Sequence, residues 1–212
     1  MKHSKIILAA AAIALMVGLA GCAKTWTVNF ARVDSISDWQ DDGEGTKELV
    51  PGVGLNVEGG TIGSPVAFDS DFEASLKFRL EASAGNYADL FFHFCDTITW
   101  NPDNYFNICF INIGNEGKEG FQILESGKFN GTVVASGINL TLPYLHRNGD
   151  NTLLVKKTGN YIEMYMNGEL IQEFVFTYCL GTKYYIRFGG NTPGEAVFTM
   201  KSVKVSYKGA ML

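Results

Sequence analysis

Two acidic stretches carry residue types that can do chemistry. In DSDFE, residues 69–73, the acids alternate with other residues, and alternate side chains share a face in a strand. Glycoside hydrolysis normally uses a carboxylate pair about 5–5.5 Å apart for retention, or ~6.5–9.5 Å apart for inversion. However, Phe72, Ala74 and Leu76 fill the intervening and following positions. This pattern favours the start of a core strand with a solvated outer face over a catalytic pair.

The second acidic stretch is Asp41-Asp42-Gly43-Glu44. Carboxylate oxygens suit Ca²⁺, so Asp41, Asp42 and Glu44 are candidate calcium ligands, and a solvated acidic turn is the alternative. The sequence contains no H-E-x-x-H, G-x-S-x-G or phosphate-binding glycine loop, and no Cys/His spacing that predicts zinc. Calcium is therefore the only cofactor that we consider.

A third stretch, CDTITWNPDNYFNIC at residues 95–109, is rich in aromatic and amide side chains. Asn-Pro-Asp is turn chemistry, so the adjacent tryptophan is expected at the surface. An exposed tryptophan suits stacking on the apolar face of a sugar, while neighbouring amides take its hydroxyl groups. The predicted ligand-binding residues are Trp100, Asn101, Asp103, Asn104 and Tyr105, with Tyr87 as a weaker companion. The alternative is that Trp100 folds back as a lid over the sheet edge.

Cys95 and Cys109 bracket this loop. If they lie opposite each other in a hairpin, His93 faces Ile111 and the two sulfurs come close enough to bridge. The alternative is a pair of free, buried cysteines that behave as small hydrophobes. His93, within LFFHFC, is expected to be a hydrogen-bonded strand residue rather than a base.

The elements that must position these residues are strands. Apolar and polar residues alternate along 72–80, 106–110, 162–166 and 203–207, which is the period-2 signal of half-buried strands. LFFHF, residues 90–94, is apolar on both faces and is typical of a central strand.

Turn residues separate these strands. Asn167-Gly168 predicts a two-residue hairpin, because both positions tolerate positive φ. Thr158-Gly159-Asn160 predicts a second hairpin just before it. Glycine is frequent, with 24 residues in 212, and no helical stripe follows the N-terminal segment. The expected fold class is all-β, a two-sheet antiparallel sandwich.

Three segments, residues 71–94, 151–174 and 195–207, resemble the concanavalin A-like jelly rolls, and among them the laminin G-like and 3-keto-disaccharide hydrolase-like domains. The similarity covers most of residues 25–208. It implies two curved sheets whose concave face and rim loops meet glycans. The E-x-D-x-x-E pattern of laminarinase-like relatives is absent from this sequence, so the resemblance transfers no catalytic residue.

The N-terminal residues predict where the protein is located. Lys2 and Lys5 precede an apolar run of 16 residues from position 6 to 21, the layout of a secretory signal. This run is slightly short for a membrane span of ~17–25 residues. Leu19-Ala20-Gly21-Cys22 resembles the lipobox of bacterial lipoproteins, which implies cleavage after residue 21 and lipid on Cys22. A plain secreted protein is the alternative.

The resulting organisation is a signal peptide at 1–21, a lipidated cysteine with a short tether at 22–24, and one β-sandwich domain at 25–208. Position 23 is Ala rather than the Asp that resembles an inner-membrane retention signal, which favours anchoring in the outer membrane of the cell envelope. No linker-like composition separates Cys22 from the first predicted strand.

Charge excludes some partners. After loss of the two lysines in residues 1–21, the side-chain charge is (17 − 2) − 22 = −7, which argues against nucleic acid and against electrostatic docking on anionic lipid. The sequence thus predicts an envelope-anchored, non-catalytic glycan-binding protein. The alternatives are a hydrolase-like enzyme acting on a modified disaccharide, or an adhesin or structural module that binds a protein.

Overall fold

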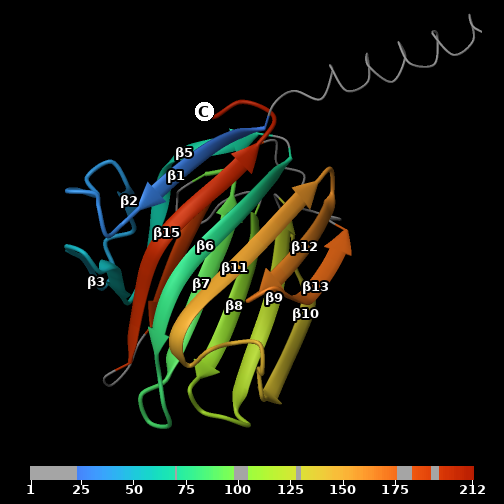
Figure 1. Ribbon diagram of the computed structural model, residues 1–212. Coiled ribbons are helices and arrows are strands. Elements are labelled where there is room, and N and C mark those ends of the chain that lie inside the picture. The colour runs from blue at the N-terminus through green and yellow to red at the C-terminus, as the bar shows by residue number, and fades with distance from the viewer. Residues whose placement is uncertain (1–22, 70, 98–104, 128–129, 176–182, 192–195) are drawn as a thin grey trace, which may run out of the picture.

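The computed structural model describes residues 23–69, 71–97, 105–127, 130–175, 183–191 and 196–212. These residues form two antiparallel sheets that pack face to face (Figure 1). Among them, no helix is long and apolar enough to cross a membrane.

The sheet at the front of Figure 1, here called sheet A, has the order β13-β12-β11-β6-β15-β4-β3, and β1 also pairs with β15. Its strands are β1 (Lys24–Asn29), β3 (Thr46–Val50), β4 (Gly54–Glu58), β6 (Phe72–Glu81), β11 (Asn148–Thr158), β12 (Tyr161–Met166), β13 (Glu169–Val175) and β15 (Val197–Tyr207).

The second sheet, sheet B, lies behind it with the order β10-β9-β8-β7-β14-β5-β2. Its strands are β2 (Gln40–Asp41), β5 (Thr61–Asp69), β7 (Ala88–Cys95), β8 (Tyr105–Ile113), β9 (Glu119–Gly127), β10 (Asn130–Leu140) and β14 (Lys183–Asn191). With two antiparallel sheets and no helix among the described residues, the all-β sandwich predicted from the sequence is confirmed.

Alternation of side chains explains why the sheets pack. In β6, every second residue from Phe72 to Leu80 is buried, and the residues between them point to the outer face of sheet A. Aromatic rings join the two layers: Phe78 of β6 lies with its ring centroid 5.4 Å from that of Phe92 of β7. Phe94 and Phe106, on neighbouring strands of sheet B, stack at 4.5 Å. The four alternating segments predicted from the sequence are all strands; alternate residues are buried in three of them, whereas residues 106–110 of β8 are buried on both faces.

Both predicted hairpins are present. Asn167 and Gly168 have φ of 54° and 91° and connect β12 to β13, as the mirror-image turn requires. Thr158 pairs with Tyr161 across the turn between β11 and β12. The Asn167 side chain also donates to the Tyr144 carbonyl and accepts from the Thr152 amide, each at 2.8 Å, so this turn also joins the segment before β11 to sheet A.

Strand β1 joins sheet A at its first described residues. Its six residues pair with β15 in a continuous register from Lys24 opposite Tyr207 to Asn29 opposite Ser202. The other terminus joins sheet B, where the Leu212 amide and carbonyl bond the backbone of Ala67. Both ends of the described chain are therefore held by backbone hydrogen bonds.

Candidate functional site

Strand β7 is the middle strand of sheet B, between β14 and β8. Leu90, Phe92 and Phe94 are fully buried in the core, which leaves Phe91 and His93 on the outer face, both partly exposed. The prediction that LFFHF forms a central strand is thus confirmed.

Cross-strand pairing gathers further side chains around these two. His93 lies opposite Arg187 of β14 and Asn107 of β8, and cross-strand partners project on the same face. One position along, Phe91 lies opposite Gly189 and Cys109. We call this surface the aromatic–polar face and define it by eight residues: Phe91, His93, Tyr105, Asn107, Cys109, Gln122, Tyr185 and Arg187.

Position 189 of β14 requires glycine, because the backbone of residues 60 and 61 lies very close to it. A Cβ atom at this position would lie 2.0 Å from the Gly60 carbonyl oxygen and 2.8 Å from the Thr61 Cα atom. Any side chain would therefore push β14 away from β5. As a result, no side chain separates Phe91 from this part of β5.

A charged network supports one side of the face. The Arg187 guanidinium, 2% exposed, donates to the Thr61 hydroxyl and lies 3.8 Å from the Asp42 carboxylate. Asp42 accepts hydrogen bonds from the Thr61 amide at 2.6 Å and the Lys47 ammonium at 2.8 Å. Burial alone would raise the pKa of Asp42, but these hydrogen bonds lower it below its usual range. Asp42 is therefore a stable carboxylate at neutral pH.

This network includes the residues of the predicted calcium site, which stays a prediction. The Lys47 ammonium lies 2.8 Å from both Asp41 and Asp42, and it also contacts the Glu44 carbonyl. The positive charge expected from a metal ion is thus supplied by a side chain. The Glu44 side chain is exposed. Within the part of the chain that the structure describes, no three His, Cys, Asp or Glu side chains form a group able to hold a metal ion.

His93 has an unusual environment. Burial and, to a smaller extent, the Arg187 cation together lower its pKa to about 4, although the Asp42 carboxylate opposes the shift. The imidazole is therefore neutral at pH 7. Its Nε2 atom is buried and makes no hydrogen bond. The expected strand position is confirmed, but the expected hydrogen bond is not found at this atom.

The two cysteines do not face each other, which corrects the predicted register. Cys95 lies opposite Tyr105, and Cys109 lies opposite Phe91, four residues from Cys95 along β7. At ~3.3 Å per residue this separates their Cα atoms by more than ~13 Å, beyond the ~7 Å limit for a disulfide. Both side chains are buried, and no disulfide joins them. The register differs because β8 begins at Tyr105 and shortens the loop.

The environment of Cys109 keeps its thiol protonated. Its thiol donates to the Asn107 side-chain oxygen at 3.3 Å. Burial raises its pKa to about 11, with a small opposing effect of the Asn107 hydrogen bond and a small contribution from Asp89. The thiol is therefore protonated at neutral pH, as the alternative of small buried hydrophobes predicted.

The predicted ligand-binding loop is described only in part. Trp100, Asn101, Asp103 and Asn104 lie outside the described residues. Tyr105 opens β8 and is partly exposed on the aromatic–polar face.

Tyr87 is not beside that loop. It precedes Ala88 at the start of β7, whereas the loop leaves from the other end of the strand. Eight residues of strand correspond to about 26 Å. The structure therefore brings Tyr105 into the candidate site and places Tyr87 at the opposite end of the sandwich.

The acidic side chains of residues 69–73 either bond nearby backbone amides or face solvent. Asp69 accepts from the Ala210 amide, Asp71 accepts from the Gly159 amide at 2.7 Å, and Glu73 is exposed on the outer face of sheet A. Asp69 and Asp71 thus bond neighbouring backbone amides, and the expectation of a core strand with a solvated outer face is confirmed.

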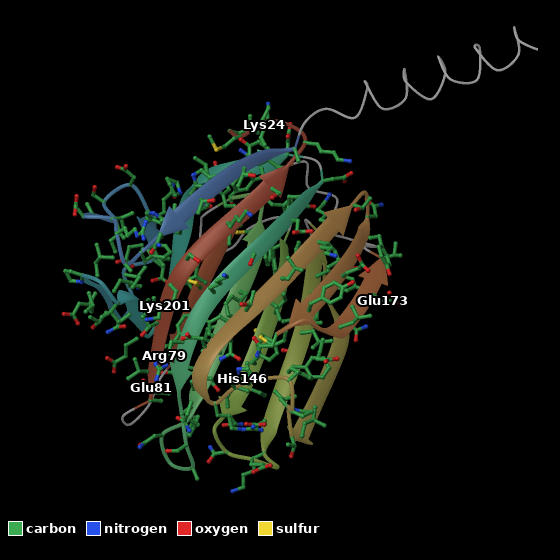
Figure 2. The ribbon with its side chains drawn as sticks, in the orientation of Figure 1. Lys24, Arg79, Glu81, His146, Glu173 and Lys201 are labelled. Carbon is green, nitrogen blue, oxygen red and sulfur yellow. The ribbon has the colours of Figure 1, made fainter. Side chains whose placement is uncertain are left out.

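The two outer faces differ in composition. Sheet A carries mainly charged residues and small polar residues, among them the exposed pair Arg79–Glu81 on β6, while Glu173 lies on the edge strand β13 (Figure 2). Its exposed or partly exposed rings are those of Tyr161 and Tyr165 on β12. Sheet B carries partly exposed aromatic rings with amide, imidazole and guanidinium groups. The first is typical of a solvated surface, and the second is typical of a ligand site.

Most residues of the aromatic–polar face were missed in the sequence. Arg187 and Tyr185 lie in KYYIRF, a segment with no motif, and they join β7 only through pairing between strands about 90 positions apart. The available signal was alternation. In strands whose alternate residues are core, the outward residues of LFFHF and KYYIRF are aromatic or charged instead of small and polar.

No family model matches the chain, and no curated protein matches it. Solved structures do. An endo-β-1,3-glucanase from Pyrococcus furiosus has a TM-score of 0.66 at 12% identity, covering 86% of this chain and 93% of that one. The carbohydrate recognition domain of Emp46p, potassium-bound, has a TM-score of 0.66 at 12% identity, covering 86% and 96%.

The carbohydrate-binding module CBM66 from Bacillus subtilis has a TM-score of 0.54 at 12% identity, covering 79% of this chain and 94% of the module. At such identities these similarities show the fold, which is the concanavalin A-like jelly roll expected from the sequence. The finer resemblance to 3-keto-disaccharide hydrolase-like domains stays a prediction.

Proposed function

We propose that this chain is a lipid-anchored cell-envelope protein whose aromatic–polar face binds a glycan without cleaving it. One observation carries the proposal. Partly exposed rings of Phe91, Tyr105 and Tyr185 share a single face with Arg187, His93 and other hydrogen-bonding side chains. Rings pack on the apolar faces of sugars, and the polar groups between them bond hydroxyls.

The structural neighbours support a role with carbohydrate, since their names include a glucanase, a carbohydrate recognition domain and a carbohydrate-binding module. The distribution of carboxylates supports binding without hydrolysis. The described strands supply two carboxylates to this face: Asp89, which accepts from the Asn112 amide at 2.8 Å, and Asp69, which accepts from the Ala210 amide. They pair with Asn191 and Lys183 of β14, and this length of strand separates them by about 26 Å. Asp42 is held by Lys47. Hydrolysis normally needs two carboxylates that flank the bond.

Glycan binding is tested with the full chain in detergent, titrated with neutral and acidic oligosaccharides by calorimetry. Phe91→Ala and Tyr185→Ala are each expected to weaken binding about tenfold, or ~1.4 kcal/mol, because each removes a ring from the face. Tyr165→Ala is the matched control, since Tyr165 is a partly exposed tyrosine on the outer face of sheet A. Equal losses in all three variants, or no binding by the natural sequence, would contradict the proposal.

The anchor rests on the residues around Cys22 and on the position of β1, which begins at Lys24. Cys22→Ser is expected to abolish incorporation of radiolabelled palmitate and to release the protein from the membrane fraction, because several acyl chains give stable anchoring. Cys109→Ser is the control and should leave labelling unchanged. Retention of label in Cys22→Ser would contradict lipidation at this residue.

A second candidate, protein binding, is favoured by the β12–β13 hairpin. Leu170, Val175 and Tyr161 are 50%, 63% and 38% exposed there, and grouped exposed apolar residues often mark protein contacts. If no glycan binds the natural sequence, this hairpin is the surface to test, with Leu170→Ser as the first variant in a crosslinking experiment.

A further inference from the structure

His93 occupies the centre of the aromatic–polar face. It lies on the middle strand of sheet B, with Arg187 on one side and Asn107 on the other. The ring of Phe91 meets it edge-on, with centroids 6.4 Å apart and planes at 82°. A ligand lying across these strands would pass over the imidazole.

The Nε2 atom of this imidazole is buried and has no hydrogen-bond partner. Buried polar atoms are almost always paired, and an unpaired one in a native protein calls for an explanation. Because Nε2 lacks a hydrogen-bond partner, it lowers the stability of the free protein. A group supplied by a ligand would complete the hydrogen bond, and residues at ligand sites commonly accept such a cost.

The chemistry of the ideal partner follows from the charge state. His93 is neutral, so Nε2 is a donor in one tautomer and an acceptor in the other. A sugar hydroxyl donates and accepts, and it suits either tautomer. Side-chain rotamers commonly shift on binding, which gives a hydroxyl access to an atom that lies just below the surface of a partly exposed residue.

The charges around His93 indicate that the ligand itself is uncharged. The described strands carry two cations on this face, Arg187 and Lys183, and two carboxylates, Asp89 and Asp69, the latter directly opposite Lys183. Asp42, 3.8 Å from Arg187, adds a third negative charge. Negative charges therefore outnumber positive ones, and the face offers no excess of cations to an acidic sugar.

We propose that Nε2 of His93 hydrogen-bonds a hydroxyl group of a neutral sugar bound on the aromatic–polar face, beside the ring of Phe91. The inference rests on the proposed glycan binding, which it deepens by naming a contact atom and a ligand class. It makes His93 a determinant of specificity rather than a structural residue.

The test compares three substitutions in the full chain, with a neutral β-1,3-gluco-oligosaccharide and an acidic oligoalginate as probes. His93→Gln carries its amide nitrogen close to the position of Nε2, whereas His93→Asn reaches only the position of Nδ1. His93→Phe fills the space without a polar atom. His146→Phe is the matched control, since His146 is exposed and bonds the Asp150 carbonyl on another surface.

Binding of the neutral probe is expected to fall about tenfold in His93→Phe and His93→Asn, and only two- to threefold (roughly) in His93→Gln. The melting temperature of the free His93→Phe protein should not fall, because a buried unpaired atom is removed. A structural histidine would behave in the opposite way, with a lower melting temperature and unchanged affinity.

The other outcomes distinguish a wrong inference from a wrong proposed function. If the natural sequence binds the neutral probe and His93→Phe binds it equally well, the inference is wrong and the proposed function stands. If oligoalginate binds more tightly than the neutral probe, the neutral-sugar assignment is wrong. If neither probe nor any other glycan binds the natural sequence, the proposed function fails and the inference fails with it.

Discussion

At the scale of single residues, His93 couples the candidate site to the stability of the fold. Its pKa of about 4 in the folded chain, caused first by burial and then by Arg187, lies below its ordinary value of 6.5. Between these two values the unfolded chain binds a proton that the folded chain does not. The free energy of unfolding therefore rises with pH across this window and is fully present above about 6.5.

We expect the natural protein to lose on the order of 3 kcal/mol between pH 6.5 and 4 from this group. Urea unfolding across the window measures the loss, and His93→Gln should flatten the pH dependence because it removes the titrating group. Glu119 and Asp42 have lowered pKa values too, but their ordinary values are 4.5 and 3.8. Their effects therefore begin below pH 4.5.

The control is His146→Gln, at an exposed position, which should keep the slope of the natural protein. If His93→Gln keeps that slope as well, the imidazole is not buried in its neutral form in solution.

Residue types alone predicted part of the site. Tyr105 was expected there because it ends an aromatic loop, and it does lie on the aromatic–polar face. Arg187 and Asn107 were not predicted as site residues, because no motif surrounds them in the sequence. The sequence also could not reveal that Lys47, five positions beyond Asp42, turns back onto the carboxylates of Asp41 and Asp42.

At the scale of elements, one carboxylate joins three segments at the end of the sandwich opposite Lys24. Glu119, fully buried, accepts from the Arg147 guanidinium at 2.6 and 2.5 Å. It also accepts from the amides of Gly114 and Leu142, each at 3.1 Å. The start of β9, the turn after β8 and the segment before β11 thus meet at one side chain.

Glu119→Gln is expected to lower the free energy of unfolding by about 3 kcal/mol, because Arg147 loses its charged partner inside the protein. Burial alone would raise the pKa of Glu119, but the bonds from Arg147 and the two amides lower it. The carboxylate form is therefore the one that stabilises the fold at neutral pH. Denaturant unfolding at pH 7 gives the measurement.

An exposed ion pair provides the comparison. Arg79 and Glu81 bond at 2.8 Å on the outer face of β6, with side chains 43% and 50% exposed (Figure 2). Exposed pairs typically contribute less than ~1 kcal/mol, so Glu81→Gln should change stability little. A similar loss in the two variants would show that burial does not decide the value of these contacts.

Elements were predictable where a turn fixes the register and unpredictable where a loop does. Asn167-Gly168 specifies a two-residue turn, so the pairing of β12 with β13 could be read from the chain. The connection from β7 to β8 has no such signal. Any shift by an even number of residues keeps the same side chains in the core, and the predicted register differs from the observed one by four positions.

At the scale of the whole molecule, alternation predicted the two-sheet sandwich because one face of each strand must be buried wherever the strand pairs. It did not predict which outer face carries the candidate site. That depends on β14 lying beside β7, a contact between distant parts of the chain. The order of strands within a sheet is set by packing of the complete core, and no local pattern encodes it.

The pairing of β1 with β15 also has a mechanical consequence. If lipid holds Cys22 while a polymer pulls on the body of the protein, tension enters the fold at Lys24 and runs along β1. Ladder hydrogen bonds lie perpendicular to the strands, so this load shears all the pairs from Lys24–Tyr207 to Asn29–Ser202 together instead of peeling them apart one by one. Strand β1 would then resist the applied force as one unit, which suits a protein tethered at one end to a surface under flow.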